Sequence, residues 1–318
     1  PISPHLRFTW TTPLPPPQYR EMRYPPTPEQ LVADLVLLLD MEPRGTDRFE
    51  GRRRKGGVGR VYGGQVIAQA LAAAERTVPE DRAAHSLHAY FLRGGSEDLP
   101  IDYAIMRDFD GRSFSNRRVV ATQRGEPILN LTASFQVPGT GLSHQSTSIG
   151  DVPQPEELES DNVVSRRYSD GISFPHQTKI GMPGPIDYRS VEASRWLESG
   201  KSPPIAHTWF RTVAPLPDDP RVHRAVLAYA SDIKLLGTSI FPHDYRWGDL
   251  LSVKPASLDH AIWFHEPFRA DEWLLYVTES PWAGHARGFA NGRIFARDGR
   301  LVASVTQEGM IRVVGGES

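Results

Sequence analysis

Three short segments in the second half of the chain carry side chains that could activate a water molecule. Asp232 ends LAYASD, Ser257 precedes LDHAIWFH, and Gln307 lies in VASVTQEG. An acid can accept a proton from water, while a hydroxyl and an amide can hold that water against a polarised carbonyl. These residues form the candidate catalytic set, provided that the fold brings their three elements together.

Other catalytic chemistry finds little support in the sequence. The chain has no cysteine, so it has no thiol nucleophile, disulfide or thiolate metal site. No G-x-S-x-G motif occurs, which argues against Ser257 as the nucleophile of an α/β-hydrolase. His260 and His265 lie close together without an H-E-x-x-H helix, so neither a metal site nor a cofactor is predicted.

Two glycines, Gly63 and Gly64, open an alanine-rich run and are the candidate substrate-binding residues. One interpretation is that backbone N–H groups at the start of a helix face the substrate oxygen. The other is that residues without side chains allow tight packing of the helix on a sheet. The sequence leaves both interpretations open.

The elements that must position these residues occur twice. QVIAQALAAAERTV (65–78) and VHRAVLAYASDIKLL (222–236) have apolar residues at helical spacing. Strand-like segments follow each helix in the same order: SLHAYFLR, IDYAIMRDFD, FSNRRVVATQ and PILNLTASFQ in the first half, and LDHAIWFHEP, EWLLYVTES, RGFANGRIFARD and RLVASVTQEG in the second.

The two halves align at nearly constant spacing. His88 and His260 are 172 residues apart, and Gly125 and Gly299 are 174 apart. This spacing predicts duplication of a unit with one helix and several strands, and it predicts a shared structural role for the two histidines. Hairpin-length turns at the two glycines predict antiparallel strands, and hence an α+β layer in which the helix packs on the sheet.

The first half does not repeat the catalytic set. It has Gln69 and Ala70 in its helical region, and Ala133 aligns with Gln307. One water-activating site is therefore predicted.

The bulk properties are those of an ordinary globular protein. The chain has 318 residues, of which 39% are hydrophobic and 23% charged, so a sizeable core is expected. The net charge of −2 gives no electrostatic case for nucleic acid. No membrane span and no signal segment are predicted, and a cytoplasmic protein is expected. Residues 1–28 are dense in proline and predict an extended arm.

The motifs together resemble the acyl-CoA thioesterase II family, the TesB-like double hotdog proteins. The resemblance covers roughly residues 30–313 and both halves in order. It rests on RVYGGQ, HSLHAYFLR, DGRSFSNRRV, TASFQ, LAYASD, LDHAIWFH, EWLLY, ARGFANGRIF and DGRLVASVTQEG.

The resemblance implies an α+β double hotdog that hydrolyses acyl-CoA to a free fatty acid and coenzyme A, without a cofactor and as a homo-oligomer. Asp232, Ser257 and Gln307 would bind the attacking water, with Ser257 standing where the bacterial pattern commonly has Thr. The expected units are an N-terminal hotdog at 29–137, a linker at 138–163 rich in Pro, Gly and Ser, and a C-terminal hotdog at 164–315.

Two other functions stay open at this stage. A hotdog enoyl-CoA hydratase would need an Asp–His pair, and the adjacent Asp259 and His260 would point to opposite faces of a strand. A non-catalytic acyl-CoA-binding module is the other alternative. The basic run at 52–55 could touch the phosphates of coenzyme A, or it could be a solvated loop.

Overall fold

The computed structural model describes residues 25–53, 57, 59–169, 183–245 and 252–314. Its helices are α2 (Pro28–Leu39), α3 (Gly63–Glu75), α4 (Asp161–Ser169) and α5 (Pro220–Ser231), with short 3-10 turns η1 (Pro155–Glu157), η2 (Ala193–Trp196) and η3 (Leu236–Ile240). Its strands are β1 (Met41–Pro43), β2 (Arg48–Gly51), β3 (Ala83–Phe91), β4 (Ile101–Asp110), β5 (Phe114–Gln123), β6 (Glu126–Gln136), β7 (Ile186–Ser190), β8 (Ile205–Thr212), β9 (Val253–Ser257), β10 (Asp259–Phe264), β11 (Leu274–Gly284), β12 (Arg287–Ala296) and β13 (Leu301–Val313).

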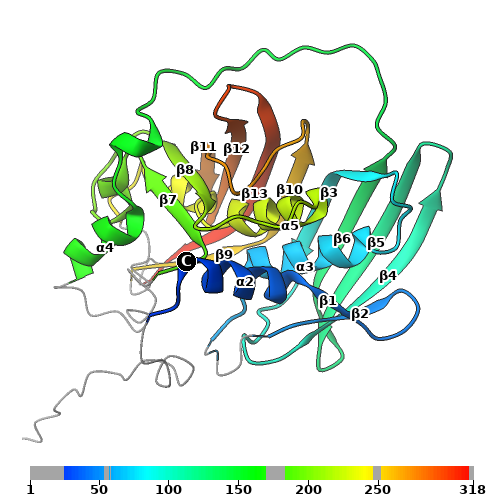
Figure 1. The fold of residues 1–318 in the computed structure, drawn as a ribbon. Helices are drawn as coiled ribbons and strands as arrows, with labels where there is room; N and C mark the ends of the chain where they lie inside the picture. The colour runs from blue at the N-terminus through cyan, green and yellow to red at the C-terminus, as the bar shows by residue number, and fades with distance from the viewer. Residues whose placement is uncertain (1–24, 54–56, 58, 170–182, 246–251, 315–318) are drawn as a thin grey trace, which may run out of the picture.

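The strands form one antiparallel sheet that runs through both halves. Its order is β1-β2-β4-β5-β6-β3-β10-β13-β12-β11-β8-β7, with β9 paired to β13. The halves join edge to edge where β3 pairs with β10, in the middle of the sheet (Figure 1). This pairing covers two edges that would otherwise expose unpaired backbone groups.

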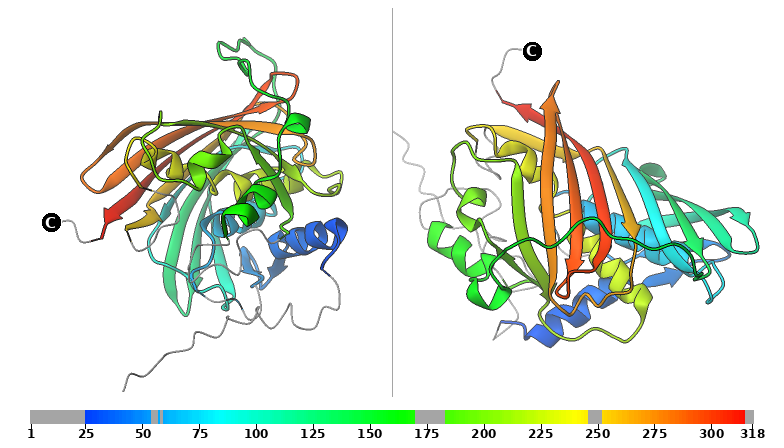
Figure 2. Two further views of the ribbon diagram at one scale, coloured as in Figure 1. Left: turned by 90° about the vertical axis from the view of Figure 1, so that its left-hand side faces the viewer. Right: turned by 90° about the horizontal axis from the view of Figure 1, so that it is seen from above.

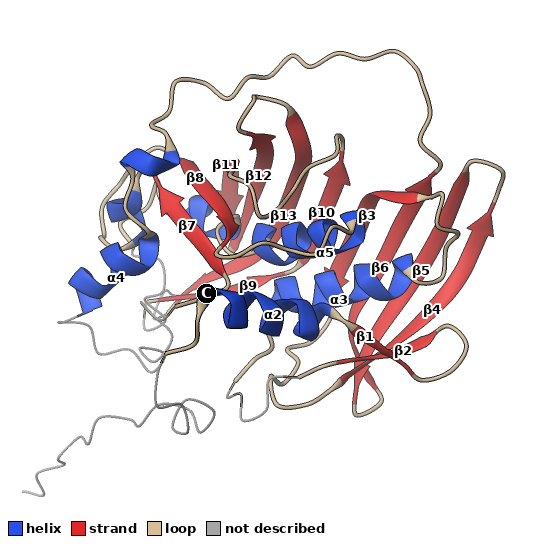
Figure 3. Cartoon of the chain, in the orientation of Figure 1, coloured by secondary structure: helices blue, strands red, loops and turns tan. Residues whose placement is uncertain are grey.

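Helices α3 and α5 pack against one face of this sheet and against each other (Figure 3). The alanine-rich α3 is buried on nearly every side, as the composition of its run favours. The N-terminal turn of α3 lies at the C-terminal end of α5, where Gly64 contacts Asp232. At the opposite ends, Glu75 of α3 meets Arg224 of α5, so the two helices run antiparallel.

The segment that follows β6 lies across the other face of the second half of the sheet, where it crosses the strands in Figure 2. A second apolar cluster forms there, with Trp209, Leu275 and Phe295 packed against Ile149 and Val152 of the segment. These strand residues alternate with neighbours that face α5, as the two-residue period of a strand requires. Apolar contacts therefore hold the segment that follows β6 on the sheet, although its sequence has no helical or strand-like period.

The strand pairing fixes the register of the duplication. His88 lies opposite Thr132 between β3 and β6, and Ala261 lies opposite Thr306 between β10 and β13. Thr132 and Thr306 are 174 residues apart, the spacing of the two turn glycines. Ala261 therefore takes the place of His88, and the histidine spacing of 172 is one residue too short.

His260 instead takes the place of Leu87, one position along. Both Leu87 and His260 are fully buried, whereas His88 is exposed and its ring lies perpendicular to that of Trp263. The prediction that the two histidines share a structural role is wrong, because they face opposite sides of the sheet.

Helix α5 ends at Ser231, so Asp232 is its C-cap residue and not part of a longer helix. Most of the proline-rich arm lies outside the described residues, and α2 begins at Pro28 with Thr27 as its N-cap. Helix α4 spans the expected boundary at residue 163, and the unit boundaries stay a prediction. None of the described helices is long and apolar enough to cross a membrane.

Candidate active site

The fold brings the three predicted catalytic side chains into one hydrogen-bonded cluster. Asp232 follows α5, Ser257 ends β9, and Gln307 lies on β13. Gln307 Nε2 donates to Asp232 Oδ1 at 2.6 Å and to Ser257 Oγ at 2.9 Å. Ser257 Oγ lies 3.5 Å from Asp232 Oδ1.

Burial makes this cluster a water-poor environment. Gln307 is fully buried, and the side chain of Asp232 is 6% exposed. Both N–H groups of the Gln307 amide are engaged by Asp232 and Ser257, which leaves neither for a third acceptor. The amide therefore fixes the carboxylate and the hydroxyl relative to each other.

The glycines at the start of α3 meet the same carboxylate. The backbone N–H of Gly64 donates to Asp232 Oδ2 at 2.9 Å. Tyr62, the N-cap residue, makes no side-chain cap, so Asp232 from the other unit satisfies one of the free N–H groups of α3. The positive end of the helix dipole also favours a carboxylate at this position.

The two glycines answer different packing demands. A Cβ at Gly63 would lie 2.7 Å from Asp232 Oδ2, so this position keeps space beside the carboxylate. A Cβ at Gly64 would meet the carbonyl oxygen of Tyr229, so this position allows α3 to approach α5. Gly64 therefore allows close packing, although against the helix α5 and not against the sheet, while a contact of either glycine with the substrate stays a prediction.

Tyrosine hydroxyls hold the C-terminal end of α5, a feature that the sequence patterns did not indicate. Tyr62 donates to Tyr229 O at 2.7 Å, Tyr276 donates to Ser231 O at 2.9 Å, and Tyr188 lies 3.5 Å from Ala230 O. These are the carbonyls that a helix leaves unsatisfied at its end. Burial, together with the nearby charge of Asp232, raises the pKa of Tyr62 and of Tyr276, so both hydroxyls remain donors.

No group of His, Asp and Glu side chains within the described part of the chain is arranged to hold a metal ion. The site offers a carboxylate, a hydroxyl, an amide and backbone N–H groups instead. Such a set can orient and deprotonate a water beside a carbonyl.

Comparison with known proteins gives the family. Residues 185–310 match the family model for acyl-CoA thioesterase, and residues 52–136 match the model for the acyl-CoA thioesterase N-terminal domain. The chain is 38% identical to acyl-CoA thioesterase 2 of Haemophilus influenzae, over 89% of this chain and 98% of that protein. The chain belongs to the acyl-CoA thioesterase family. It is also 38% identical to acyl-coenzyme A thioesterase 8 of Homo sapiens, over 88% of this chain and 89% of that protein.

Solved structures agree with this acyl-CoA thioesterase assignment. The acyl-CoA thioesterase II TesB2 from Mycobacterium marinum is 39% identical, with a TM-score of 0.72 over 89% of this chain and 100% of that chain. A hot dog protein of unknown function from Alicyclobacillus acidocaldarius, at 19% identity and a TM-score of 0.69, covers 88% of this chain and 98% of that chain, and supports the fold alone. The predicted family and the predicted α+β double hotdog are confirmed.

The duplication lets the active-site region of this thioesterase be compared with its counterpart in the first unit. Glu75 and Asp232 each lie 12 residues after the first residue of their helices, Gly63 and Pro220. Glu75 therefore takes the place of Asp232. The sequence interpretation, which placed Gln69 and Ala70 in that region, missed this acid.

Alanines stand in the places of the hydroxyl and the amide in the first unit. Ala84 pairs with Phe135 as Ser257 pairs with Gly309, so Ala84 takes the place of Ser257. Ala133 takes the place of Gln307, as the sequence spacing indicated. We call Glu75, Ala84 and Ala133 the duplicate site.

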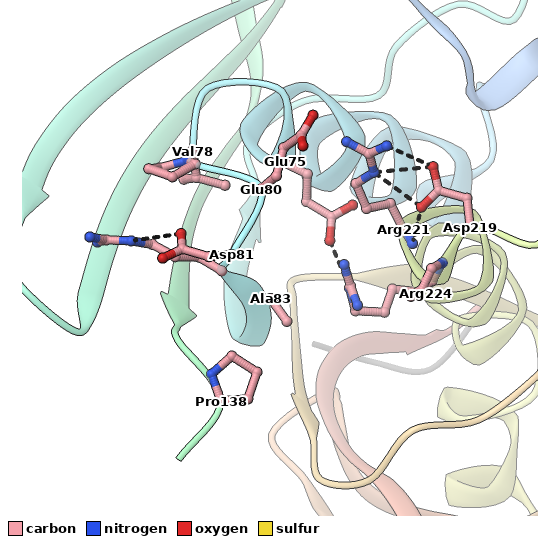
Figure 4. A pocket seen from close by; sticks show the side chains of 12 residues that line it. Glu75, Val78, Glu80, Asp81, Ala83, Pro138, Asp219, Arg221 and Arg224 are labelled. Carbon is pink, nitrogen blue, oxygen red and sulfur yellow. Dashed lines mark hydrogen bonds and ion pairs between the residues drawn. The ribbon is translucent and has the colours of Figure 1, made fainter.

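Glu75 of the duplicate site pairs with an arginine instead. Arg224 Nε donates to Glu75 Oε1 at 2.7 Å, beside a cavity of about 340 Å³ at the start of α5 (Figure 4). Burial raises the pKa of Glu75 to about 7, although the charge of Arg224 opposes this rise. Only the cluster in the second unit combines a carboxylate with a hydroxyl and an amide.

Proposed function

We propose that this chain hydrolyses acyl-CoA to a free fatty acid and coenzyme A, and that Asp232, Ser257 and Gln307 activate the water. The observation that carries the proposal is the buried Asp232 carboxylate, fixed by Gln307 on one oxygen and by the Gly64 N–H on the other. Such a carboxylate can accept a proton without moving. The family membership supplies the substrate class.

The proposed reaction needs no covalent intermediate. The oxygen of a water held by Ser257 attacks the thioester carbonyl carbon while Asp232 takes one of its protons. The resulting tetrahedral intermediate collapses, and the carbon–sulfur bond breaks. The proton on Asp232 then passes to the thiolate of coenzyme A, which leaves the carboxylate ready for the next cycle.

Gly63 is the best candidate to stabilise the oxyanion. Gly64 already donates its N–H to Asp232, whereas the N–H of Gly63 has no hydrogen-bond partner among the residues described. It lies in the first turn of α3, where the helix dipole favours negative charge. A Cβ here would lie 2.7 Å from Asp232 Oδ2 and 3.0 Å from the Phe91 ring, so only glycine fits beside the carboxylate.

The hydratase alternative fits the geometry less well. Asp259 accepts a hydrogen bond from the Glu308 backbone at 2.6 Å and is part-exposed, while His260 on the same strand is fully buried. A histidine with no exposed surface is poorly placed to exchange a proton with a substrate. The other alternative, a module that binds acyl-CoA without turnover, differs from a thioesterase in releasing no free thiol.

A panel of acyl-CoAs of increasing chain length tests the proposal by release of free thiol. The chain has no cysteine, so a thiol reagent reports coenzyme A alone. We expect turnover by the wild type and a loss of about 10²-fold or more in Asp232→Asn, because the base is removed. Asp259→Asn is the matched control and should retain activity. Tight binding without thiol release, or full activity in Asp232→Asn, would contradict the proposal.

The proposal extends to assembly, location and coenzyme A binding. We propose a homo-oligomer in the cytoplasm, which light scattering coupled to gel filtration and cell fractionation would test. Of the basic run at 52–55, Arg52 and Arg53 are exposed, while 54 and 55 lie outside the described residues. Arg53 donates to Asp98 O at 2.6 Å, so part of the run is already bonded to the protein.

A further inference from the structure

His260 is a buried polar residue beside the proposed base that the reaction does not use. It has no exposed surface, and its Nδ1 lies 3.9 Å from Asp232 Oδ1. Its Nε2 lies 2.9 Å from Ser231 Oγ, whereas Nδ1 has no hydrogen-bond partner within the described structure. A buried imidazole nitrogen without a partner is unfavourable unless it serves a neighbouring charge.

The single proton of the Ser231 hydroxyl determines which nitrogen of His260 carries hydrogen. If Ser231 Oγ donates to Ala228 O, at 3.1 Å, then Nε2 is protonated and the lone pair of Nδ1 faces a carboxylate. If it donates to Nε2, at the shorter 2.9 Å, then Nδ1 carries the hydrogen and presents it to Asp232. The second arrangement replaces a repulsion by an attraction.

Burial favours the neutral form of His260. Burial lowers the pKa of His260, and the charge of Asp232, which raises it, is the opposing influence. The titratable groups besides His260 that interact electrostatically with Asp232 are the hydroxyls of Tyr62, Tyr188 and Tyr276, and burial raises the pKa of each. The imidazole of His260 is therefore already neutral and acts on Asp232 as a dipole, without losing a proton.

The duplicate site provides an internal comparison. Leu87 stands in the place of His260, and Ala84 and Ala133 stand in the places of Ser257 and Gln307. Leucine fills this position in one unit, so the fold alone does not require a polar residue there. The histidine occurs in the unit that has the hydroxyl and the amide.

We propose that His260 is a positioning residue for Asp232, whose Nδ1–H faces the carboxylate and keeps it correctly aimed. The inference rests on the proposed role of Asp232 as the base. At 3.9 Å the contact is longer than a hydrogen bond, so the N–H acts as the positive end of a dipole in a site shielded from water. Gln307 holds the carboxylate directly, and His260 supports it from the strand β10.

His260→Leu, which introduces the residue of the other unit, is the main test. We expect kcat at pH 7 to fall about tenfold, with KM within about twofold, and the acid limb of the kcat profile to move up by about one pH unit. His260→Asn, whose amide can place an N–H near Nδ1, should restore most of kcat and the wild-type limb. His265→Leu is the matched control. It removes the 2.9 Å contact between His265 Nε2 and Ser304 Oγ, which does not involve Asp232.

Two further measurements keep the test decisive. The wild type and Asp232→Asn are assayed on the same acyl-CoAs, so that a failure of the proposed function is seen separately. Nitrogen-15 NMR of the wild type between pH 6 and 8 reports the tautomer of His260 even if His260→Leu does not fold. We expect a neutral ring with hydrogen on Nδ1. Hydrogen on Nε2 alone, or an unchanged pH profile in a folded His260→Leu, would overturn the inference.

Discussion

Replacing Gly63 by alanine should separate activity from stability. The new methyl group would lie 2.7 Å from Asp232 Oδ2, while ordinary contact begins at 3.4 Å. The carboxylate must therefore move by roughly 0.7 Å, away from the position that Gln307 and the Gly64 N–H define. A displacement of about 1 Å in a reacting group can cost about 10²-fold in rate, so we expect kcat to fall by roughly that factor.

The fold should tolerate this change. Gly63 does not have a positive φ, and alanine is favoured over glycine within a helix by up to about 1 kcal/mol. The free energy of unfolding should therefore change by no more than about 1 kcal/mol in either direction. Thiol release from acyl-CoA and urea denaturation of the same preparations give the two quantities.

Gly64→Ala is the matched control at the neighbouring position. Its methyl group would meet the backbone oxygen of Tyr229, which is less able to yield than a side chain. We expect a loss of stability of about 1–3 kcal/mol, because α3 must move away from α5. A Gly63→Ala enzyme with wild-type kcat would refute the reasoning that this glycine keeps space for the base.

Three other predictions concern the ends of the paired helices. Burial raises the pKa of Glu75 from 4.5 to about 7, so its contribution to stability is full below pH 4.5 and is lost as the pH rises through 7. Between pH 4.5 and 8 the free energy of unfolding of the wild type, measured by denaturant titration, should therefore fall by about 3 kcal/mol more than that of Glu75→Gln. The same pH dependence of this free energy in both proteins would contradict the prediction. Arg224→Leu should destabilise the fold by about 3–5 kcal/mol at pH 8, since it leaves Glu75 unpaired, and by less at pH 6. The double variant with Glu75→Leu should recover most of this loss of stability. Tyr276→Phe should lower the free energy of unfolding by about 1–3 kcal/mol and lower kcat, because Ser231 O loses its hydrogen-bond donor next to Asp232. Tyr188→Phe removes only a 3.5 Å contact and should have a smaller effect on both quantities.

Much of the fold could be predicted because the periodic segments agree with their tertiary setting. The runs at 101–110 and 114–123 form β4 and β5 at the expected residues, since their alternating side chains match the two faces of a sheet. The end of α5 was not predicted. The apolar spacing continues to Leu236, but tyrosine hydroxyls from other elements cap the carbonyls at Ser231 and its neighbours.

The candidate site could be predicted only in part. Asp232, Ser257 and Gln307 were found because each lies in a recognisable motif, and the structure brings them together. The contact of His260 with Asp232 depends on a one-residue shift in register, which sequence spacing does not resolve. The acid Glu75 was missed because a buried carboxylate in an alanine-rich helix has no local pattern.

A single turnover in water labelled with oxygen-18 tests the central claim most directly. If Asp232 activates a water, the fatty acid from the first turnover carries one labelled oxygen, and the enzyme carries none. If the Asp232 carboxylate instead attacked the thioester carbon, a mixed anhydride would form with loss of the coenzyme A thiolate. Opening of this anhydride by water at the Asp232 carbonyl carbon would release an acid with an unlabelled oxygen from Asp232 and leave the label in the Asp232 peptide. Mass spectrometry of both products gives the result: label in the acid is the outcome predicted here, and label in Asp232 would contradict it.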